Sequence, residues 1–499
     1  MIIKPINTMK RISHAIMFLL IISLIPFQPY GQVVDPGTLN DLKVINKGNV
    51  AYGDYFTDKT MRFDYFHSGT AREEHFSADR TVSDGPWPGS LTVLTDPLEL
   101  GLYLFEVVDQ ESHILLYSRG FASIFGEWQT IPEAETELGT FHESIRFPWP
   151  KNPVTIIMKK RDAENKFKTI WAYNIDPASR KVNPAEITHP EVVDIILDNG
   201  PASQKVDIVI LGDGYTKDEM QKFRFDATRL TNVLLSQEPF LSRKNDISVR
   251  AVETPSEVSG VSRPHPGVFK RTALSAHYGS FDSERYVLSY DNRKIRDVAS
   301  AVPYDFMVIL INERTYGGGG IYNLYTTVSV DNGFGEYIMV HELGHHMGAL
   351  ADEYYTSSIA YETPKVTAEP WETNITALFD RKNLKWKDLV EDETPIPTPW
   401  NKEPFDQFGY QVQQKRDSLR AAKVPEELVE ELFRQQMRQE DQFFAVEKYK
   451  DQVGAFEGAG YLAKGLYRPQ LDCIMYTRHM HFCKVCQKSI EDVMNTFCK

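Results

Sequence analysis

The amino-acid sequence predicts an all-β sandwich domain followed by a larger α/β domain with a mixed, mostly parallel sheet. In the first part, short runs of β-branched, Leu and aromatic residues are separated by Pro, Gly and Asp, and no convincing amphipathic helix lies between them. In the second part, continuous apolar runs alternate with helical patterns. This alternation is typical of strands that are buried on both faces under covering helices.

The composition excludes several classes of protein. The 499 residues carry a formal net charge of −14, so the chain lacks the positive field that holds nucleic-acid phosphates. Aromatic residues make up 12% of the chain, which argues against intrinsic disorder. We therefore expect a folded, multi-domain protein that does not bind nucleic acid.

The N-terminus has the pattern of a secretory signal peptide. Lys4, Lys10 and Arg11 precede an uncharged apolar run, Ala15–Pro26. This run is shorter than the roughly 20 apolar residues that a membrane-spanning helix needs. We predict that residues 1–32 are a signal peptide and that the mature protein is exported without stable membrane insertion. A retained N-terminal anchor is the alternative.

The β-rich domain is predicted over residues 33–173. Its expected strands are Met61–Phe66, Leu91–Leu94, Leu102–Val108, Ile114–Tyr117, Phe141–Phe147, Val154–Met158 and Phe167–Tyr173. No catalytic set of residues occurs in this segment, so an accessory or packing role is favoured over a carbohydrate- or protein-binding role. A polar stretch that contains prolines, residues 174–190, is the expected linker.

The α/β domain is predicted over residues 191–499. Its expected buried strands are Val206–Leu211, Ile247–Val252 and Phe306–Ile311. Thr216 and Glu219 form a capping box that opens a helix, and a second helix is expected around Lys294–Ala299. Tyr316–Gly320 is expected to be a flexible loop. The polar, alternating segment Tyr325–Val330 suits an exposed sheet edge that could pair with an extended polypeptide.

The most informative segment contains His341, Glu342 and His345. Residues four apart on an α-helix lie on one face, so the two imidazoles can share a Zn²⁺ ion. Glu342 lies beside that face, where its carboxylate can take a proton from a metal-bound water without coordinating the metal. The pattern predicts one catalytic zinc ion, with Glu342 as the general base of a hydrolysis reaction.

The third zinc ligand is expected shortly after the helix ends. Gly348 marks the expected end of the helix, where the chain can turn back toward the metal. In the metzincin pattern of zinc proteases the third ligand is a His six residues after the second one, but Ala351 occupies that position here. Asp352 is preferred over Glu353 as the third ligand, and the other carboxylate would then orient a ligand.

These motifs resemble the IgA-specific metalloendopeptidase family of secreted bacterial zinc peptidases. The resemblance lies in HELGHHMGALADEYY (residues 341–355), LGDGYT (residues 211–216), VGAFEGAGYLAKGLYRP (residues 453–469), Cys473-Ile474-Met475 and FCKVC (residues 482–486). The apparent N-terminal β domain also fits, so the resemblance covers nearly the whole mature chain.

The resemblance implies a metzincin-like zincin catalytic domain with Met475 in the turn beneath the metal. It also implies a polypeptide substrate, and the family's name points to a host glycoprotein such as immunoglobulin A. That substrate is an analogy only, because fold and motif do not fix what a protease cleaves. Tyr461 and Tyr467 are candidate donors to the developing oxyanion, although packing roles are favoured for both.

Between the histidines and Met475, residues 403–452 are predicted to form a helical insert. Pro425 suits the first turn of a helix, and Leu428, Leu432 and Phe433 give that helix an apolar stripe. A solvated helical hairpin is favoured over a lid or exosite that selects substrate.

The four cysteines lie close to the C-terminus, and an exported chain permits disulfides. A helix from Lys484 to Phe497 would separate Cys486 from Cys498 by about 18 Å, too far for a disulfide. The remaining pairings are Cys473–Cys498 with Cys483–Cys486, or Cys473–Cys486 with Cys483–Cys498. A structural Cys₄ zinc site is the rival interpretation.

The favoured function is that of a zinc endopeptidase secreted to the periplasm, cell surface or surroundings of a bacterium. The alternative is an exported binding or adhesion protein with an inactive or structural zincin domain. A zinc amidase that acts on cell-wall peptides is a third hypothesis. The intact Glu342 argues against an inactive domain, because a domain without activity needs no general base.

Overall fold

The computed structural model describes residue 39 and residues 42–48, 50–357 and 366–498. The predicted signal peptide lies outside these residues. Within the described part of the chain, none of the helices combines the length and the apolar character needed to cross a bilayer.

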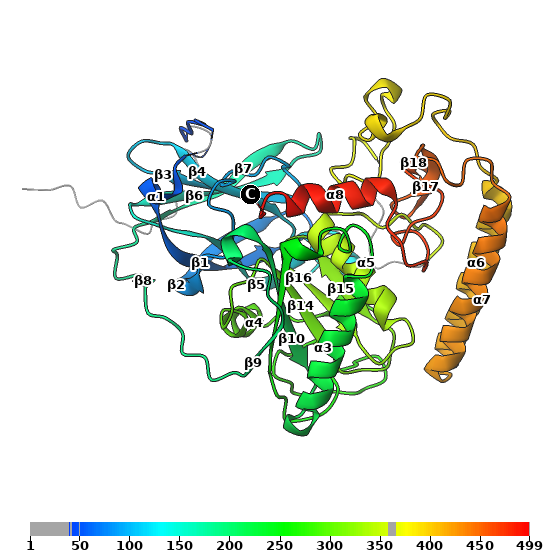
Figure 1. The fold of residues 1–499 in the computed structure, drawn as a ribbon, viewed down its shortest axis with the longest axis horizontal. Helices are drawn as coiled ribbons and strands as arrows, with labels where there is room; N and C mark the ends of the chain where they lie inside the picture. Colours follow the sequence, from blue (N-terminus) through cyan, green and yellow to red (C-terminus); the bar gives the residue numbers. More distant parts are fainter. Residues whose placement is uncertain (1–38, 40–41, 49, 358–365, 499) are drawn as a thin grey trace, which may run out of the picture.

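The N-terminal region is built from two four-stranded sheets, in the orders β5-β1-β2-β8 and β4-β3-β6-β7 (Figure 1). The strands are β1 (Phe56–Gly69), β2 (Glu74–Pro86), β3 (Tyr103–Asp109), β4 (Leu115–Phe121), β5 (Gly139–Pro150), β6 (Val154–Arg161), β7 (Phe167–Ile175) and β8 (Val182–Asn183). Side chains from both sheets, including Phe63 of β1 and Met158 of β6, form one hydrophobic core. The short helices α1 (Tyr52–Tyr55) and α2 (Ile124–Trp128) flank these strands.

One expected strand of this region is wrong, and one long observed strand was missed. Leu91–Leu94 is irregular rather than a strand, and Leu94 is apolar because it is buried in the core. The long strand β2 was not predicted, because much of it is polar and faces solvent, which hides the usual apolar pattern.

The second region contains a six-stranded mixed sheet in the order β15-β16-β14-β10-β11-β9. Its strands are β9 (Val193–Leu197), β10 (Val206–Asp213), β11 (Ile247–Val252), β14 (Phe306–Ile311), β15 (Gly318–Ile321) and β16 (Tyr325–Ser329). The four central strands run parallel, and β9 and β15 are antiparallel to their neighbours. The predicted mixed, mostly parallel sheet is therefore confirmed. A separate pair, β12 (His277–Tyr278) and β13 (Val287–Leu288), is antiparallel.

Helices cover both faces of this sheet. The helices are α3 (Met220–Leu234), α4 (Asn292–Ala299), α5 (Gly335–Gly348) and α8 (Lys484–Met494). Ile208 and Ile210 of β10 pack into the core shared with α3 and α5, whereas Val209 and Leu211 pack into the core shared with α4. This alternation explains why the strand is apolar without interruption. The Thr216–Glu219 capping box is present and leads through a short 3₁₀ turn into α3.

The sheet edge differs from the prediction. Tyr325–Val330 was expected at the edge, but β16 is fully buried between β14 and β15. The edge strand is β15, which lies within the glycine run that was expected to be a flexible loop. The glycines are required there because a Cβ atom on Gly320 would lie 2.1 Å from the carbonyl oxygen of Glu342 in α5. The edge strand β15 therefore packs directly against helix α5.

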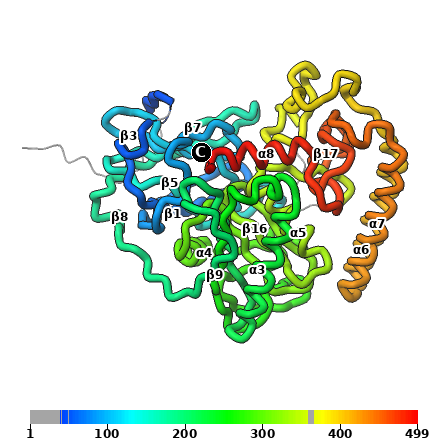
Figure 2. The backbone as a smooth tube through the Cα atoms, in the orientation of Figure 1, coloured from blue at the N-terminus to red at the C-terminus, as the bar shows by residue number. Residues whose placement is uncertain are grey.

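The predicted helical insert forms a hairpin of two long helices, α6 (Lys402–Ala421) and α7 (Glu426–Ala445). This hairpin lies on the side of the molecule away from the N-terminal sheets, as Figures 1 and 2 show. The antiparallel pair β17 (Phe456–Ala459) and β18 (Leu462–Arg468) follows it. The chain then returns to the centre, where α8 packs against α5.

Candidate metal centre

Helix α5 brings the two predicted histidine ligands together. Most of its residues are buried, because the helix packs between the sheet and α8 and carries apolar side chains on nearly all sides. His341 and His345 lie one turn apart, and their Nε2 atoms are 3.3 Å from each other. The side chains converge as the spacing predicts.

Backbone carbonyls fix the orientation of both imidazoles. The Nδ1 atom of His341 lies 2.9 Å from the carbonyl oxygen of Ile474, and the Nδ1 atom of His345 lies 2.6 Å from that of Leu350. A carbonyl oxygen only accepts hydrogen bonds, so each Nδ1 carries the proton and donates it. The lone pair of each Nε2 is therefore directed to the shared point, as in metal-binding histidines.

Asp352 completes a set of three ligand atoms. Its Oδ1 atom lies 3.1 Å from His341 Nε2 and 3.3 Å from His345 Nε2. No donor among the described residues forms a well-directed hydrogen bond to this buried Oδ1 atom. Although burial alone would lower it, the Asp352 carboxylate raises the pKa of His345 to about 9, so positive charge, from a proton or from a metal ion, is favoured at this point. Three acceptor atoms that face one another need a shared cation.

The turn after α5 delivers Asp352 to this point. The helix ends at Gly348, as expected, and the next residue, Ala349, takes the left-handed conformation with a φ of 53°. The chain then reverses, and Asp352 is held by a hydrogen bond from the amide of Gly460 to its carbonyl oxygen, 3.0 Å long. Glu353, the alternative third ligand, points away from the histidines into a different cluster.

Met475 lies directly beneath α5. It is fully buried within a turn in which the Tyr476 amide donates to the Cys473 carbonyl oxygen over 2.8 Å. Its sulfur packs so closely against Gly344 that a Cβ atom there would lie 2.9 Å from Sδ.

His346, which follows His345 in the sequence, faces the other way, toward Thr326, and burial lowers its pKa to about 3. His346 is therefore a packing residue rather than a ligand.

Glu342 lies on the wall of a cavity of about 690 Å³ that also exposes the His341, His345 and Asp352 side chains. Burial raises the pKa of the Glu342 carboxyl, although the two histidines beside it act in the opposite direction. A carboxylate that is destabilised in this way is a better proton acceptor than an exposed one.

The predicted tyrosines are placed very differently. The Tyr461 hydroxyl donates a 2.5 Å hydrogen bond to Asp352 Oδ2 and lies on the cavity wall. Tyr467 pairs through its backbone with Thr376 and lies outside the cavity wall. Arg285 and Tyr354 also line the cavity, joined by a 3.0 Å hydrogen bond, but no motif in the sequence marks them.

Comparison with protein families identifies the chain. The family model described as IgA Peptidase M64 matches residues 195–494, and the model described as Peptidase M64 N-terminus matches residues 51–172. The chain belongs to the IgA Peptidase M64 family. It is therefore a peptidase, a hydrolase that acts on polypeptides, in a family of metallopeptidases. No curated protein matches the chain.

The M64 N-terminal region forms part of the cavity wall. Glu127 of α2, and Arg161 and Asn165 of the β6–β7 hairpin, line the same cavity as the histidines. The amide of Asn165 donates a 2.8 Å hydrogen bond to the carbonyl oxygen of Glu369 on the opposite side. An accessory or packing role was favoured for this region over a binding role, but its residues line the cavity beside His341, His345 and Asp352.

The cysteines of the M64 peptidase do not form the predicted disulfides in this structure. All four are free thiols, and no two Sγ atoms in the described residues lie at bonding distance. Cys498 lies apart from the other three, with its sulfur 3.7 Å from the carbonyl oxygen of Asp246. Both predicted pairings required a Cys498 bond, so neither fits this arrangement.

Proposed function

We propose that this M64 peptidase is a zinc-dependent endopeptidase in which His341, His345 and Asp352 bind the catalytic ion and Glu342 is the general base. The observation that supports this most directly is the convergence of two Nε2 lone pairs and the unpartnered Asp352 Oδ1 within one cavity. Two imidazoles and one carboxylate with open space beside them form the donor set of a catalytic zinc site.

When bound, zinc supplies a Lewis acid that polarises the scissile carbonyl and makes water a stronger acid. Glu342 then accepts the proton of the attacking water and passes it to the leaving nitrogen. The Ile474 and Leu350 carbonyls hold the imidazoles in place during the reaction, and Tyr461 holds the Asp352 carboxylate. Arg285 adds a positive charge to the cavity wall, which favours the negative charge that develops on the substrate oxygen.

The edge strand β15 is the proposed backbone-binding site for an extended substrate. Gly318 and Gly320 line the cavity, and β15 is the last strand of the sheet on this side. The outer edge is occupied at Gly318, whose amide donates a 3.1 Å hydrogen bond to the Arg285 carbonyl oxygen, so the proposed pairing begins at Gly320. A peptide paired along this edge would pass next to Glu342. This assignment replaces the buried strand β16, which was expected at the edge.

The proposal extends to the domains and the location of the enzyme. Residues 191–499 form a metzincin-like domain with Met475 as the floor beneath the metal, and residues 33–173 form a β-sandwich domain joined to it by residues 174–190. Residues 1–32 direct export to the periplasm, cell surface or surroundings of a bacterium. A host glycoprotein such as immunoglobulin A is the substrate that the family's name suggests.

Hydrolysis of a mixed peptide library by the purified, zinc-loaded protein, followed by mass spectrometry, tests the proposal. We expect internal cleavage by the wild type, loss of cleavage after chelation, and recovery when zinc is returned. Glu342→Gln should be inactive but fully folded, and Glu336→Gln, an exposed position on the same helix, is the matched control. A wild-type protein that leaves every peptide intact would favour the alternative, an exported binding or adhesion protein.

A further inference from the structure

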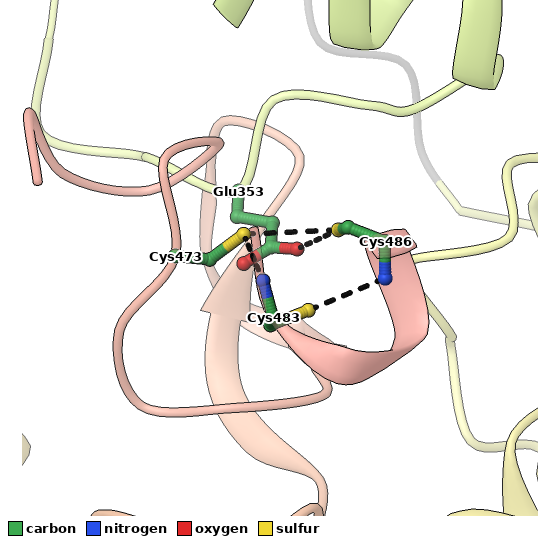
Figure 3. A group of neighbouring side chains, drawn as sticks. All are labelled: Glu353, Cys473, Cys483 and Cys486. Atoms are coloured by element: carbon green, nitrogen blue, oxygen red, sulfur yellow. Dashed lines mark hydrogen bonds between the residues drawn. The ribbon is translucent and has the colours of Figure 1, made fainter. Parts of the chain in front are cut away.

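A second group of metal-ligating side chains lies next to the catalytic centre but outside its cavity. Glu353, Cys473, Cys483 and Cys486 place one ligand atom each within 4.8 Å of one another. All four residues are buried, with exposed fractions of 2% or less. Figure 3 shows the Glu353 carboxylate surrounded by the three cysteines. None of these residues lines the cavity that holds the catalytic histidines.

The distances fit a tetrahedral zinc site. With Zn–S bonds of about 2.3 Å and Zn–O bonds of about 2.0 Å, a tetrahedron has S···S edges of about 3.8 Å and S···O edges of about 3.5 Å. The Sγ atoms of Cys473 and Cys486 are 3.7 Å apart, and Cys486 Sγ is 3.5 Å from Glu353 Oε1. The S···S distance is much longer than the roughly 2.0 Å of a disulfide bond.

The local backbone is arranged to support thiolates. Cys483 is the N-cap residue of α8, and its sulfur accepts from the amide of Cys486 at 3.5 Å. The amide of Cys483 in turn donates to Cys473 Sγ at 3.3 Å. These N–H groups and the positive end of the helix favour negative charge on sulfur.

Glu353 supplies a separate indication that a cation belongs here. Asn374 orients its carboxylate through a 2.9 Å hydrogen bond to Oε1, but the buried Oε2 has no hydrogen-bond partner within the described chain. Among the described residues Glu353 is in no ion pair, and Arg468 is the positive side chain that acts on its carboxyl, from beyond ion-pair distance. A fully buried carboxylate without such a partner is costly unless a proton or a metal ion compensates its charge, and the three sulfur atoms around Glu353 are ligands for a metal ion.

We propose that Glu353, Cys473, Cys483 and Cys486 bind a second zinc ion with a structural role. Three sulfur donors and one carboxylate in a tetrahedron favour zinc over calcium or magnesium, which prefer oxygen ligands. All four positions are supplied by the protein and are sealed from solvent, so no position remains for water or substrate. Binding displaces the thiol protons to solvent.

The second ion would join two segments that the catalytic centre needs. Glu353 follows Asp352 directly, and Cys473 precedes Ile474, whose carbonyl oxygen orients His341. The amide of Glu353 also donates a 2.8 Å hydrogen bond to the Met475 carbonyl oxygen. Glu353 and Cys486 lie 133 positions apart in the chain, so the ion would hold the third ligand and the Met475 turn in fixed positions.

Cobalt substitution of the full exported chain tests this proposal, because cobalt bound by thiolates gives a strong charge-transfer absorption in the near ultraviolet that a His₂Asp centre cannot give. We expect this band in the wild type produced with cobalt in place of zinc. The band should persist in His345→Ala, which disables the catalytic centre, and in Cys498→Ser, the matched control outside the cluster. It should be lost or strongly reduced in Cys486→Ser.

Metal analysis of the zinc-grown protein gives a second, independent measurement. We expect two zinc ions per wild-type chain and one in His345→Ala. A wild type without the charge-transfer band, or with a single zinc ion that His345→Ala removes, overturns the proposal. Peptide mapping that recovers Cys473 linked to Cys486 overturns it as well. None of these outcomes depends on whether the library is cleaved, so failure here is distinguishable from failure of the proposed function.

Discussion

Two neighbouring carboxylates, Asp352 and Glu353, face opposite sides of the same backbone. Asp352 meets two histidines at the wall of an open cavity, with the Glu342 carboxylate beside it. Glu353 meets three cysteines in a sealed interior. Both sets can hold a metal, but Asp352 belongs to a set of three side chains and Glu353 to a set of four. Access for substrate and a nearby proton acceptor are what distinguish a site for chemistry from a site for stability.

The largest difference between the two clusters should come from Asp352→Ala. The change removes one catalytic ligand, so we expect the catalytic zinc to be lost and kcat/KM to fall at least about 100-fold. The thermal midpoint should change little relative to that loss, and the thiolate–cobalt band should remain. Peptidase assays combined with metal analysis check this. Retained activity would contradict the assignment of Asp352, even if the variant held one zinc ion fewer than the wild type.

Cys486→Ser should have the reverse profile. It opens the sealed cluster, and because structural zinc contributes directly to folding, we expect the thermal midpoint to fall by about 10 °C or more. Activity measured well below that midpoint should be reduced less than in Asp352→Ala. Cys498→Ser, in which the altered cysteine lies apart from the cluster, should keep the wild-type midpoint. Equal thermal midpoints for Cys486→Ser and Cys498→Ser would mean that the cysteine cluster does not stabilise the fold, so the proposed structural role would be wrong.

The buried carboxyl group of Glu440, which belongs to neither cluster, provides a comparison for the effect of burial on stability. Glu440 of α7 is 3% exposed and accepts a 2.7 Å hydrogen bond from Gln436; burial raises its pKa to about 7. The folded state therefore favours the protonated form, and this group's contribution to stability is lost as pH rises from about 4.5 to about 7.

Glu440→Gln should thus raise the free energy of unfolding by about 3 kcal/mol at pH 8 and by very little at pH 4. Chemical denaturation at both pH values measures this. The outcome measures how much a buried, ionised carboxylate lowers the free energy of unfolding when no metal ion is bound to it. The same quantity sets the scale of the stabilisation that a cation would provide at Asp352 and Glu353. A gain of equal size at both pH values would mean that proton binding is not the cause.

The smallest effect is expected for Tyr461→Phe, which removes the hydrogen bond from the tyrosine hydroxyl to Asp352 Oδ2. Partners of this kind orient metal ligands, so we expect kcat/KM to fall about 10-fold with the fold unchanged. Tyr467→Phe, outside the cavity, is the matched control. A loss as large as that of Asp352→Ala would instead assign Tyr461 a direct part in catalysis.

Sequence patterns predicted the parts of this structure that depend on local chemistry. The apolar runs Val206–Leu211 and Phe306–Ile311 became central strands because strands buried on both faces need no polar alternation. The pair His341 and His345 converges because helix geometry fixes their spacing.

The features that were missed depend on contacts between distant segments. Glycines have low strand propensity, so β15 could not be predicted without knowing that α5 lies too close for any Cβ atom at Gly320. Cys498 was predicted to form a disulfide with another cysteine, whereas in the structure Glu353 lies beside the other three cysteines. Arg285 and Tyr354 belong to no motif, and only the fold brings them to the cavity.

The β6–β7 hairpin reaches across to the segment around Glu369, and it has a consequence for how such enzymes diversify. Arg161 and Asn165 line the cavity, and within the described structure neither is hydrogen-bonded to the histidines or Asp352. We therefore expect substitutions there to leave bond cleavage intact and to alter which side chains fit at positions remote from the scissile bond. An enzyme built in this way can change its selectivity among target sequences through an N-terminal turn, without a change in the residues proposed for hydrolysis.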